Sequence, residues 1–257
     1  SQINMLRTNH EVFKSDLNDY DLNDLNRKFK ESSPVPWIVV PEFLNPEMVI
    51  SMKGELDYEY RNNYDSHKLF TRAGSHMFEI LDNHKYDYAY KLISEVHSKP
   101  FIDFLESITG VRGLICDPSL VGAGYMRCGK GDSLKIHTDF NWNDQLYLHR
   151  VLSVIFYLNP EWDESWNGDL QLWDKERKNK EVSIFPSNGN MLIWQYDKLG
   201  YHGHPNPLDC PEGYFRDGFR FFFYVSSSEY QKDDLPHRSL YFYDESIGEP
   251  SDKESSK

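Results

Sequence analysis

The pattern of apolar and polar positions changes character near residue 114. Before that point the sequence predicts a short strand, Trp37–Val40, and then helices. Asn45 and Pro46 are the residue types expected at a helix N-cap and first helical position, and Gly110 is a typical C-cap. The predicted helices cover residues 45–56, 88–96 and 98–109.

After residue 114, short β-type runs are separated by turns rich in Gly, Pro, Asn and Asp. The run 150–159 is apolar on both faces, which is typical of a central strand, and its Phe156 and Tyr157 must point to opposite faces. Helices first and strands afterwards predict an α+β domain in which helices buttress one sheet of a sandwich or barrel. The predicted strands are 134–136, 152–158, 170–173, 182–185, 191–194 and 219–225.

The chain divides into three parts. Residues 1–35 are polar, with aspartates between leucines, and are expected to form a marginal helix or a mobile arm. Residues 36–228 are long enough for a single large domain. Residues 229–257 form a charged tail, and its last ten residues are expected to be disordered because they contain too little apolar surface to bury.

The composition excludes several classes of partner. A net charge of -13 makes nucleic acid an unfavourable partner, because such a surface repels phosphates. No apolar run approaches the ~18 residues of a membrane span, and residues 1–10 lack the apolar stretch of a signal peptide. The three cysteines form no CxxC pair, so we expect reduced thiols and a cytoplasmic location.

The most informative motif is His137-Thr138-Asp139, at the end of the run 134–136. Residues two apart on an extended backbone lie on one side of it, so an imidazole and a carboxylate can meet there. Either His202 or His204 can add a second imidazole. Two histidines and one carboxylate leave the other coordination positions open, as a non-haem Fe(II) oxygenase requires. With ten histidines about one such motif arises by chance, so the surrounding sequence must agree.

Two arginines near the last predicted strand are candidate anion binders. Arg216 stands at the strand start, where a buried guanidinium can bind the distal carboxylate of a dicarboxylic co-substrate through a bidentate fork. Arg220 lies four residues on, hence on the same face of a regular strand, and is the alternative. The phenol of Tyr157 can donate a hydrogen bond to a buried carboxylate if it faces the interior.

Several elements recur in the order found in one known superfamily. They are His137-Thr138-Asp139-Phe140-Asn141, then Arg150 with Tyr157-Leu158-Asn159-Pro160-Glu161-Trp162, then Gly168 with Leu172-Trp173, then His202-Gly203-His204-Pro205 with Pro207-Leu208. Over residues 113–226 the chain resembles the Fe(II)/2-oxoglutarate-dependent oxygenases of the prolyl 4-hydroxylase-like superfamily. The resemblance is specific for the superfamily and not for a subfamily.

The resemblance implies a double-stranded β-helix, a jelly-roll or cupin-like barrel, buttressed by N-terminal helices. It implies that His137, Asp139 and His202 bind Fe(II), because the first histidine after the Trp-rich strand is normally the ligand. Arg216 falls at the position that binds 2-oxoglutarate, and Tyr157 matches a tyrosine that bonds the same carboxylate.

The sequence departs from the family pattern beside Arg216. Relatives commonly have Arg-x-Ser, whereas Asp217 and Gly218 follow here, so the hydroxyl is missing. Arg127 stands where relatives carry Tyr or Gln. Further candidates for contact with the co-substrate or substrate are Arg127, Arg150, Trp173 and Arg220.

The resemblance implies a dioxygenase that hydroxylates an unactivated C–H bond, with Fe(II), 2-oxoglutarate and O₂, and with ascorbate as an optional reductant. Asp139 favours hydroxylation, because halogenating relatives replace this carboxylate. A prolyl residue of a peptide or protein is the first substrate class; a free amino acid, sugar or small metabolite is the alternative. A non-catalytic, metal-binding cupin-like module is the alternative of another class, favoured if both Arg216 and Arg220 pair with acidic side chains. The sequence does not predict the oligomeric state.

Overall fold

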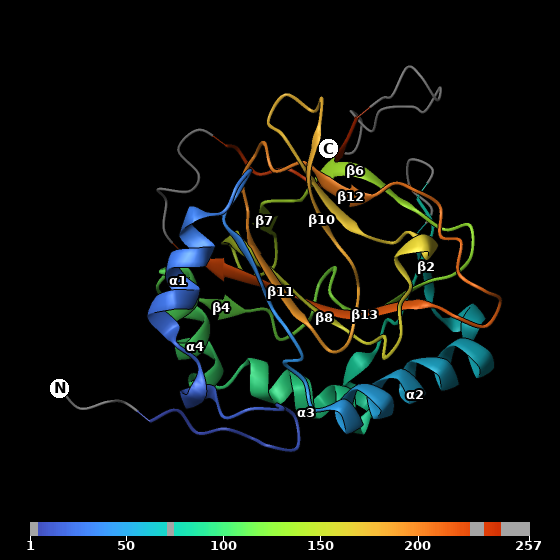
Figure 1. Ribbon diagram of the computed structural model, residues 1–257, viewed down its shortest axis with the longest axis horizontal. Coiled ribbons are helices and arrows are strands. Elements are labelled where there is room, and N and C mark those ends of the chain that lie inside the picture. Colours follow the sequence, from blue (N-terminus) through green and yellow to red (C-terminus); the bar gives the residue numbers. More distant parts are fainter. Residues whose placement is uncertain (1–4, 71–74, 227–233, 243–257) are drawn as a thin grey trace.

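The computed structural model describes residues 5–70, 75–226 and 234–242, and it contains two facing antiparallel sheets with helices along one side (Figure 1). The larger sheet has the order β1-β11-β8-β13-β5-β3-β2, with β4 beside β13 and β7 beside β8. Its strands are β1 (Trp37–Val40), β2 (Lys68–Phe70), β3 (Met77–Glu79), β4 (Ile115–Cys116), β5 (Gly124–Cys128), β7 (Trp142–Asn143), β8 (Leu148–Tyr157), β11 (Met191–Gln195) and β13 (Arg216–Val225).

The smaller sheet has the order β10-β9-β12-β6-β14. Two facing antiparallel sheets with N-terminal helices are the arrangement expected of a buttressed double-stranded β-helix. The strands of the smaller sheet are β6 (Leu134–Thr138), β9 (Leu170–Trp173), β10 (Lys180–Ile184), β12 (His202–His204) and β14 (Leu240–Tyr241).

The helices have the end signals that the sequence indicated. The side chain of Asn45 accepts a hydrogen bond from the Glu47 amide at the start of α2, and Gly110 ends α4 with a φ of 75°. The helix predicted over residues 45–56 is longer in the structure, where α2 continues to Asn62. The helices are α1 (Leu22–Glu31), α2 (Pro46–Asn62), α3 (Asp87–Val96) and α4 (Lys99–Thr109), with 3-10 turns at Leu17–Asp19, Tyr64–Ser66, Asn83–Lys85 and Glu164–Trp166.

The apolar residues form two clusters on opposite faces of the larger sheet. Along β8, Val154 and Phe156 belong to the cluster that packs against the helices. Ile155 and Tyr157 belong to the cluster between the two sheets. The alternation follows from the period of two along a strand, and it places the Tyr157 phenol inside the barrel.

The two ends of the chain both contribute to the domain. The polar N-terminal segment, expected to form a helix or a mobile arm, contains the helix α1. Its residues Phe13, Leu17 and Phe29 are buried in the core. Residues 234–242 belong to the predicted charged tail, 229–257, and they contain β14 of the smaller sheet. In this strand Tyr241 pairs with His137. The last ten residues, expected to be disordered, lie outside the described residues. None of the described helices is long and apolar enough to cross a membrane.

Candidate metal centre and adjoining cavities

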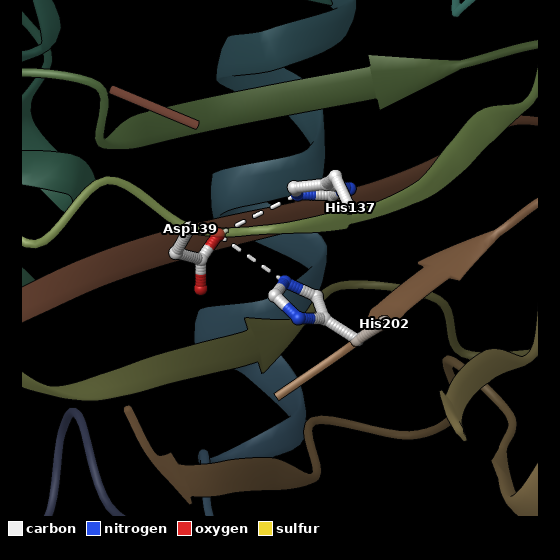
Figure 2. Close-up of side chains that lie close together, drawn as sticks. All are labelled: His137, Asp139 and His202. Carbon is white, nitrogen blue, oxygen red and sulfur yellow. Dashed lines mark ion pairs between the residues drawn. The ribbon is translucent and has the colours of Figure 1, made fainter. Parts of the chain in front are cut away.

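His137, Asp139 and His202 converge between the two sheets (Figure 2). His137 lies on β6, Asp139 follows that strand, and His202 lies opposite His137 in the pairing of β6 with β12. The Nε2 atoms of His137 and His202 are 3.5 and 3.2 Å from Oδ1 of Asp139. One ligand atom from each residue lies within 4.8 Å of the others, which is the spacing of a metal site.

Gly203 allows β12 to approach β6 closely enough for this arrangement. A Cβ at this position would lie 2.7 Å from the carbonyl oxygen of Leu134 and 2.8 Å from that of Lys135. Any side chain there would push the strands apart. The glycine between His202 and His204 therefore helps to bring His202 opposite His137.

The histidine tautomers suit a metal. Nδ1 of His137 is 2.7 Å from the carbonyl oxygen of Lys135, and Nδ1 of His202 is 2.9 Å from that of Gly200. A carbonyl only accepts, so each Nδ1 carries the proton and each Nε2 lone pair faces Asp139. Backbone carbonyls fix metal-binding histidines in this manner. The donor set, two neutral imidazoles and one carboxylate, fits Fe(II).

Arg150 positions the carboxylate ligand. Its Nη2 donates to Oδ2 of Asp139 at 2.9 Å, and its guanidinium carbon lies 3.6 Å from the ring centre of Phe222. Burial opposes the ionisation of Asp139, but the guanidinium of Arg150 holds the pKa of its carboxyl well below the usual range. Asp139 is therefore ionised, with Oδ1 directed to the histidines. Arg150 was a candidate for contact with co-substrate or substrate, which stays a prediction, and in the structure its guanidinium contacts a candidate metal ligand.

Two aromatic side chains pack against the candidate ligands. The ring of Tyr241 stacks on His137 with centres 4.7 Å apart, and Trp194 meets His202 edge-on at 5.2 Å. Burial lowers the pKa of His137, which favours the neutral form that binds metal. These rings restrict the orientation of both imidazoles.

Two cavities meet at the triad. The outer cavity has a volume of about 670 Å³ and the inner one about 40 Å³. His137 and Asp139 line both, whereas His202 lines only the inner cavity. The inner cavity is otherwise lined by Met77, Met126, Leu134, Ile155, Leu170, Trp194, His204, Arg216, Arg220 and Phe222.

Arg216 is buried in the wall of the inner cavity without an acidic partner among residues 5–70, 75–226 and 234–242. Its Nε donates to the carbonyl oxygen of Gly168 at 2.7 Å, and its Nη2 lies 3.5 Å from the hydroxyl of Tyr157. Burial raises the pKa of Tyr157, so its phenol stays protonated and able to donate. An uncompensated buried guanidinium is costly, so this site is suited to an anion.

Arg220 differs from Arg216 although the two share a strand face. Its Nη2 donates to Oε1 of Glu79 at 2.6 Å, and its Nε donates to the carbonyl oxygen of Gly122 at 2.9 Å. Glu79 neutralises its charge, which disfavours Arg220 as the carboxylate binder.

Two other candidates lie away from both cavities. Arg127 makes a bidentate ion pair with Asp217, with both distances 2.8 Å, and its Nη2 lies 2.8 Å from Asp57. Trp173 donates from its indole to Oε1 of Gln171 at 3.0 Å. Neither Arg127 nor Trp173 lines the inner or the outer cavity, so their contact with co-substrate or substrate stays a prediction.

Sequence reasoning missed two residues of the site. His204 entered only as an alternative metal ligand, whereas its side chain lines the inner cavity beside Arg216. Strand alternation after His202 was the available signal. Tyr241 lies in a charged segment with no apolar periodicity, and no signal in the sequence pointed to it.

A profile described as the 2OG-Fe(II) oxygenase superfamily matches residues 123–223. The matched segment contains the three candidate metal ligands together with Tyr157 and Arg216. No curated protein sequence matches the chain.

Solved structures with a similar fold cover most of the chain. A prolyl hydroxylase from Trichoplax adhaerens, in complex with a hypoxia inducible factor peptide fragment, has 18% identity and a TM-score of 0.56, over 86% of this chain and 100% of that chain. A prolyl-4-hydroxylase from Pseudomonas putida has 14% identity and a TM-score of 0.55, over 78% and 98%. HygX from Streptomyces hygroscopicus, with nickel, 2-oxoglutarate and hygromycin B bound, has 11% identity and a TM-score of 0.53, over 89% and 98%. At these identities the likeness establishes the double-stranded β-helix fold.

Proposed function

We propose that this chain, whose residues 123–223 match the 2OG-Fe(II) oxygenase superfamily, is a member of that superfamily and hydroxylates an unactivated C–H bond, with a prolyl residue of a peptide or protein as the first substrate class. Membership gives the enzyme class, a 2-oxoglutarate-dependent oxygenase, and its cofactors, Fe(II) and 2-oxoglutarate. The residue roles and the substrate are likewise proposed.

Each side chain of the site has a distinct task in this proposal. His137 and His202 hold iron through Nε2 and Asp139 through Oδ1, while Arg150 keeps the carboxylate ionised and oriented. Arg216 binds the distal carboxylate of 2-oxoglutarate, and Tyr157 donates to the same group. When bound, Fe(II) together with 2-oxoglutarate and O₂ supplies the oxidising chemistry that acts on the C–H bond.

The observation that carries the proposal concerns Arg216, whose guanidinium has no acidic partner among the described residues. It lines a cavity that His137, Asp139 and His202 also line. A non-catalytic module would be favoured if Arg216 and Arg220 were both neutralised by acidic side chains. Within the part of the chain that the structure describes, Glu79 neutralises Arg220, and no acidic side chain pairs with Arg216. A retained buried charge is explained by an anion that binds between it and the metal.

The outer cavity supports a substrate of side-chain size or larger. Its volume of about 670 Å³ lies within the range of small-molecule sites. The aromatic rings of Phe140, Trp142, Phe222 and Tyr241 line it and can pack against an apolar ring such as pyrrolidine. Two of the similar folds are prolyl hydroxylases. A free amino acid, sugar or small metabolite is the second candidate, since HygX holds hygromycin B.

The proposal is tested by succinate release with Fe(II), 2-oxoglutarate, ascorbate and O₂, against prolyl peptides, free amino acids and glycans. We expect one class to stimulate succinate formation and to gain the mass of one oxygen atom. Stimulation only by a non-prolyl class would transfer the assignment to that class. No turnover, together with no measurable binding of 2-oxoglutarate, would reject the proposal.

The metal assignment has its own test. His137→Ala and His202→Ala should each lose stoichiometric iron and all turnover, because two protein ligands leave the ion mostly to solvent. His204→Ala should retain iron. His84→Ala, at an exposed position on the surface, is the matched control and should retain both iron and turnover. Iron loss in His204→Ala but not in His202→Ala would move the ligand by two residues.

A further inference from the structure

His204 is a buried polar side chain without a function in the metal centre. Only 2% of its surface is exposed, and within the described part of the chain neither ring nitrogen has a hydrogen-bond partner. An imidazole offers at least one N–H donor in any protonation state. A buried donor without a partner is unfavourable, so its presence calls for a ligand that pairs with it.

The strand geometry directs His204 into the inner cavity. His202 and His204 are two apart on β12 and both line the inner cavity, although the pairing with β6 shifts register between them. A Cβ at Gly203 would meet the backbone of β6. His202 meets the other metal ligands, whereas His204 lies opposite Leu134 and lines the cavity together with Arg216. The imidazole of His204, from the smaller sheet, and the guanidinium of Arg216, from the larger sheet, therefore line the same cavity.

The neighbouring position on β13 cannot supply a donor. Gly218 follows Arg216 on the same face, and a Cβ there would lie 2.7 Å from Cε of Met126. A serine hydroxyl at this position would collide with Met126 unless that side chain moved. Besides the three candidate metal ligands, the polar residues that line the inner cavity are Arg220, which Glu79 neutralises, and Arg216 and His204. The hydroxyl of Tyr157 lies 3.5 Å from Nη2 of Arg216.

We propose that His204 is a further binding residue for 2-oxoglutarate, which donates a hydrogen bond to the distal carboxylate held by Arg216; this rests on the proposed function. A carboxylate has about four lone-pair sites, and Arg216, Tyr157 and His204 are all donors. His204 thereby adds selectivity for 2-oxo acids that carry a second carboxylate at the far end.

The experiment is a calorimetric titration of the Mn(II)-loaded protein without O₂, so that binding is measured in the absence of turnover. The probes are 2-oxoglutarate and 2-oxopentanoate, which lacks the distal carboxylate. His204→Leu should raise the Kd of 2-oxoglutarate about tenfold or more, because a hydrogen bond to a charged group is lost. The Kd of 2-oxopentanoate should stay unchanged, since it has no distal carboxylate to bond.

His204→Asn provides a second variant that keeps a side-chain N–H donor and should recover part of the affinity. It also serves if the leucine variant does not fold. Metal content and melting temperature are measured for each variant, and both should match the parent protein.

The outcomes separate this inference from the proposed function. If Arg216→Met weakens binding of 2-oxoglutarate and neither His204 variant does, His204 is not a binding residue and the proposed function stands. Equal weakening of both probes by His204→Leu, or a loss of metal, would assign His204 a structural or ligand role and overturn the inference. If no variant at Arg216 or His204 affects 2-oxoglutarate, the proposed co-substrate site itself is wrong.

Discussion

Arg216 and Asp217 are neighbours on β13, yet they represent opposite solutions to the burial of a charge. Asp217 points to the helix side, where it accepts two hydrogen bonds from Arg127 at 2.8 Å and one from Lys53 at 2.6 Å. Arg216 points between the sheets, where a carbonyl and a phenol are its hydrogen-bond partners and no carboxylate of the described residues neutralises it. The charge on the helix side is neutralised within the chain, and we propose that a ligand neutralises the charge between the sheets.

The difference indicates which buried charges serve stability and which serve binding. Desolvation penalises an ion on either face, but a matched partner offsets the penalty only on the helix side. Truncation of Arg127 should therefore lower the free energy of unfolding and preserve the affinity for 2-oxoglutarate. Truncation of Arg216 should lower the affinity for 2-oxoglutarate and not the stability.

The largest effect on stability is expected from Arg127→Met. The variant leaves Asp217 buried with Lys53 as its remaining cationic partner, and the free energy of unfolding should fall by about 3–5 kcal/mol. Denaturant unfolding measures this change, and the affinity of surviving folded protein for 2-oxoglutarate should be preserved. The matched control is Arg127→Met with Asp217→Asn, which removes both charges and should recover much of the loss. A decrease below about 1 kcal/mol in the single variant would show that the ion pair of Arg127 with Asp217 contributes little to the stability of the fold.

Arg216→Met should change affinity rather than stability. Loss of one partner of a buried charged pair costs about 2–5 kcal/mol, so the Kd for 2-oxoglutarate should rise about 30-fold or more. The melting temperature of the ligand-free protein should stay the same or rise, because an uncompensated buried charge is removed. Calorimetry and thermal unfolding provide the two readings.

Arg220→Ala is the comparison for that variant, since Arg220 shares the strand face and is neutralised by Glu79. We expect a weaker effect on 2-oxoglutarate. If Arg220→Ala weakens the binding of 2-oxoglutarate and Arg216→Ala does not, the carboxylate site lies four residues further along β13 than proposed.

A smaller effect should follow acidification. Burial opposes the charge of Asp217, but Arg127 and Lys53 lower its pKa below the ordinary value of 3.8. A carboxyl whose pKa is lower in the folded state contributes stability that is fully present above the unfolded pKa and is lost as the pH falls through the folded pKa. The free energy of unfolding should therefore decrease below about pH 4. In Asp217→Asn, the slope against pH in this range should be shallower; an identical slope would exclude Asp217 as a contributor.

The sequence was sufficient to identify the three candidate metal ligands that converge in the structure, because their signal is local. His137 and Asp139 are two residues apart at a strand end, and His202 follows in a motif with a recognisable order. The larger strands were likewise visible as apolar runs, whereas β5 and β12, which contain polar residues and glycine, were not.

The partners of the arginines were not visible in the sequence, because they lie far away along the chain. Arg220 meets Glu79 across 141 positions and Arg127 meets Asp217 across 90. Arg216 and Arg220 have the same strand face, so strand alternation does not distinguish them, whereas their tertiary contacts do. The same holds for His204. Strand alternation indicates the side to which its ring points, but it does not show that the ring nitrogens lack a hydrogen-bond partner in the described part of the chain.

The smallest effect is expected from Tyr157→Phe, which tests whether the phenol adds to the site formed by Arg216. The hydroxyl lies 3.5 Å from Nη2 of Arg216, at the limit of a hydrogen bond, so its removal should change the arginine position little. Loss of one neutral donor to the co-substrate should cost about 0.5–1.5 kcal/mol, and hence raise the Kd of 2-oxoglutarate about 2- to 12-fold. The same titration with 2-oxopentanoate should show no change. A loss as large as that of Arg216→Met would mean that the phenol fixes the guanidinium, because the carboxylate would then have lost its main partner as well.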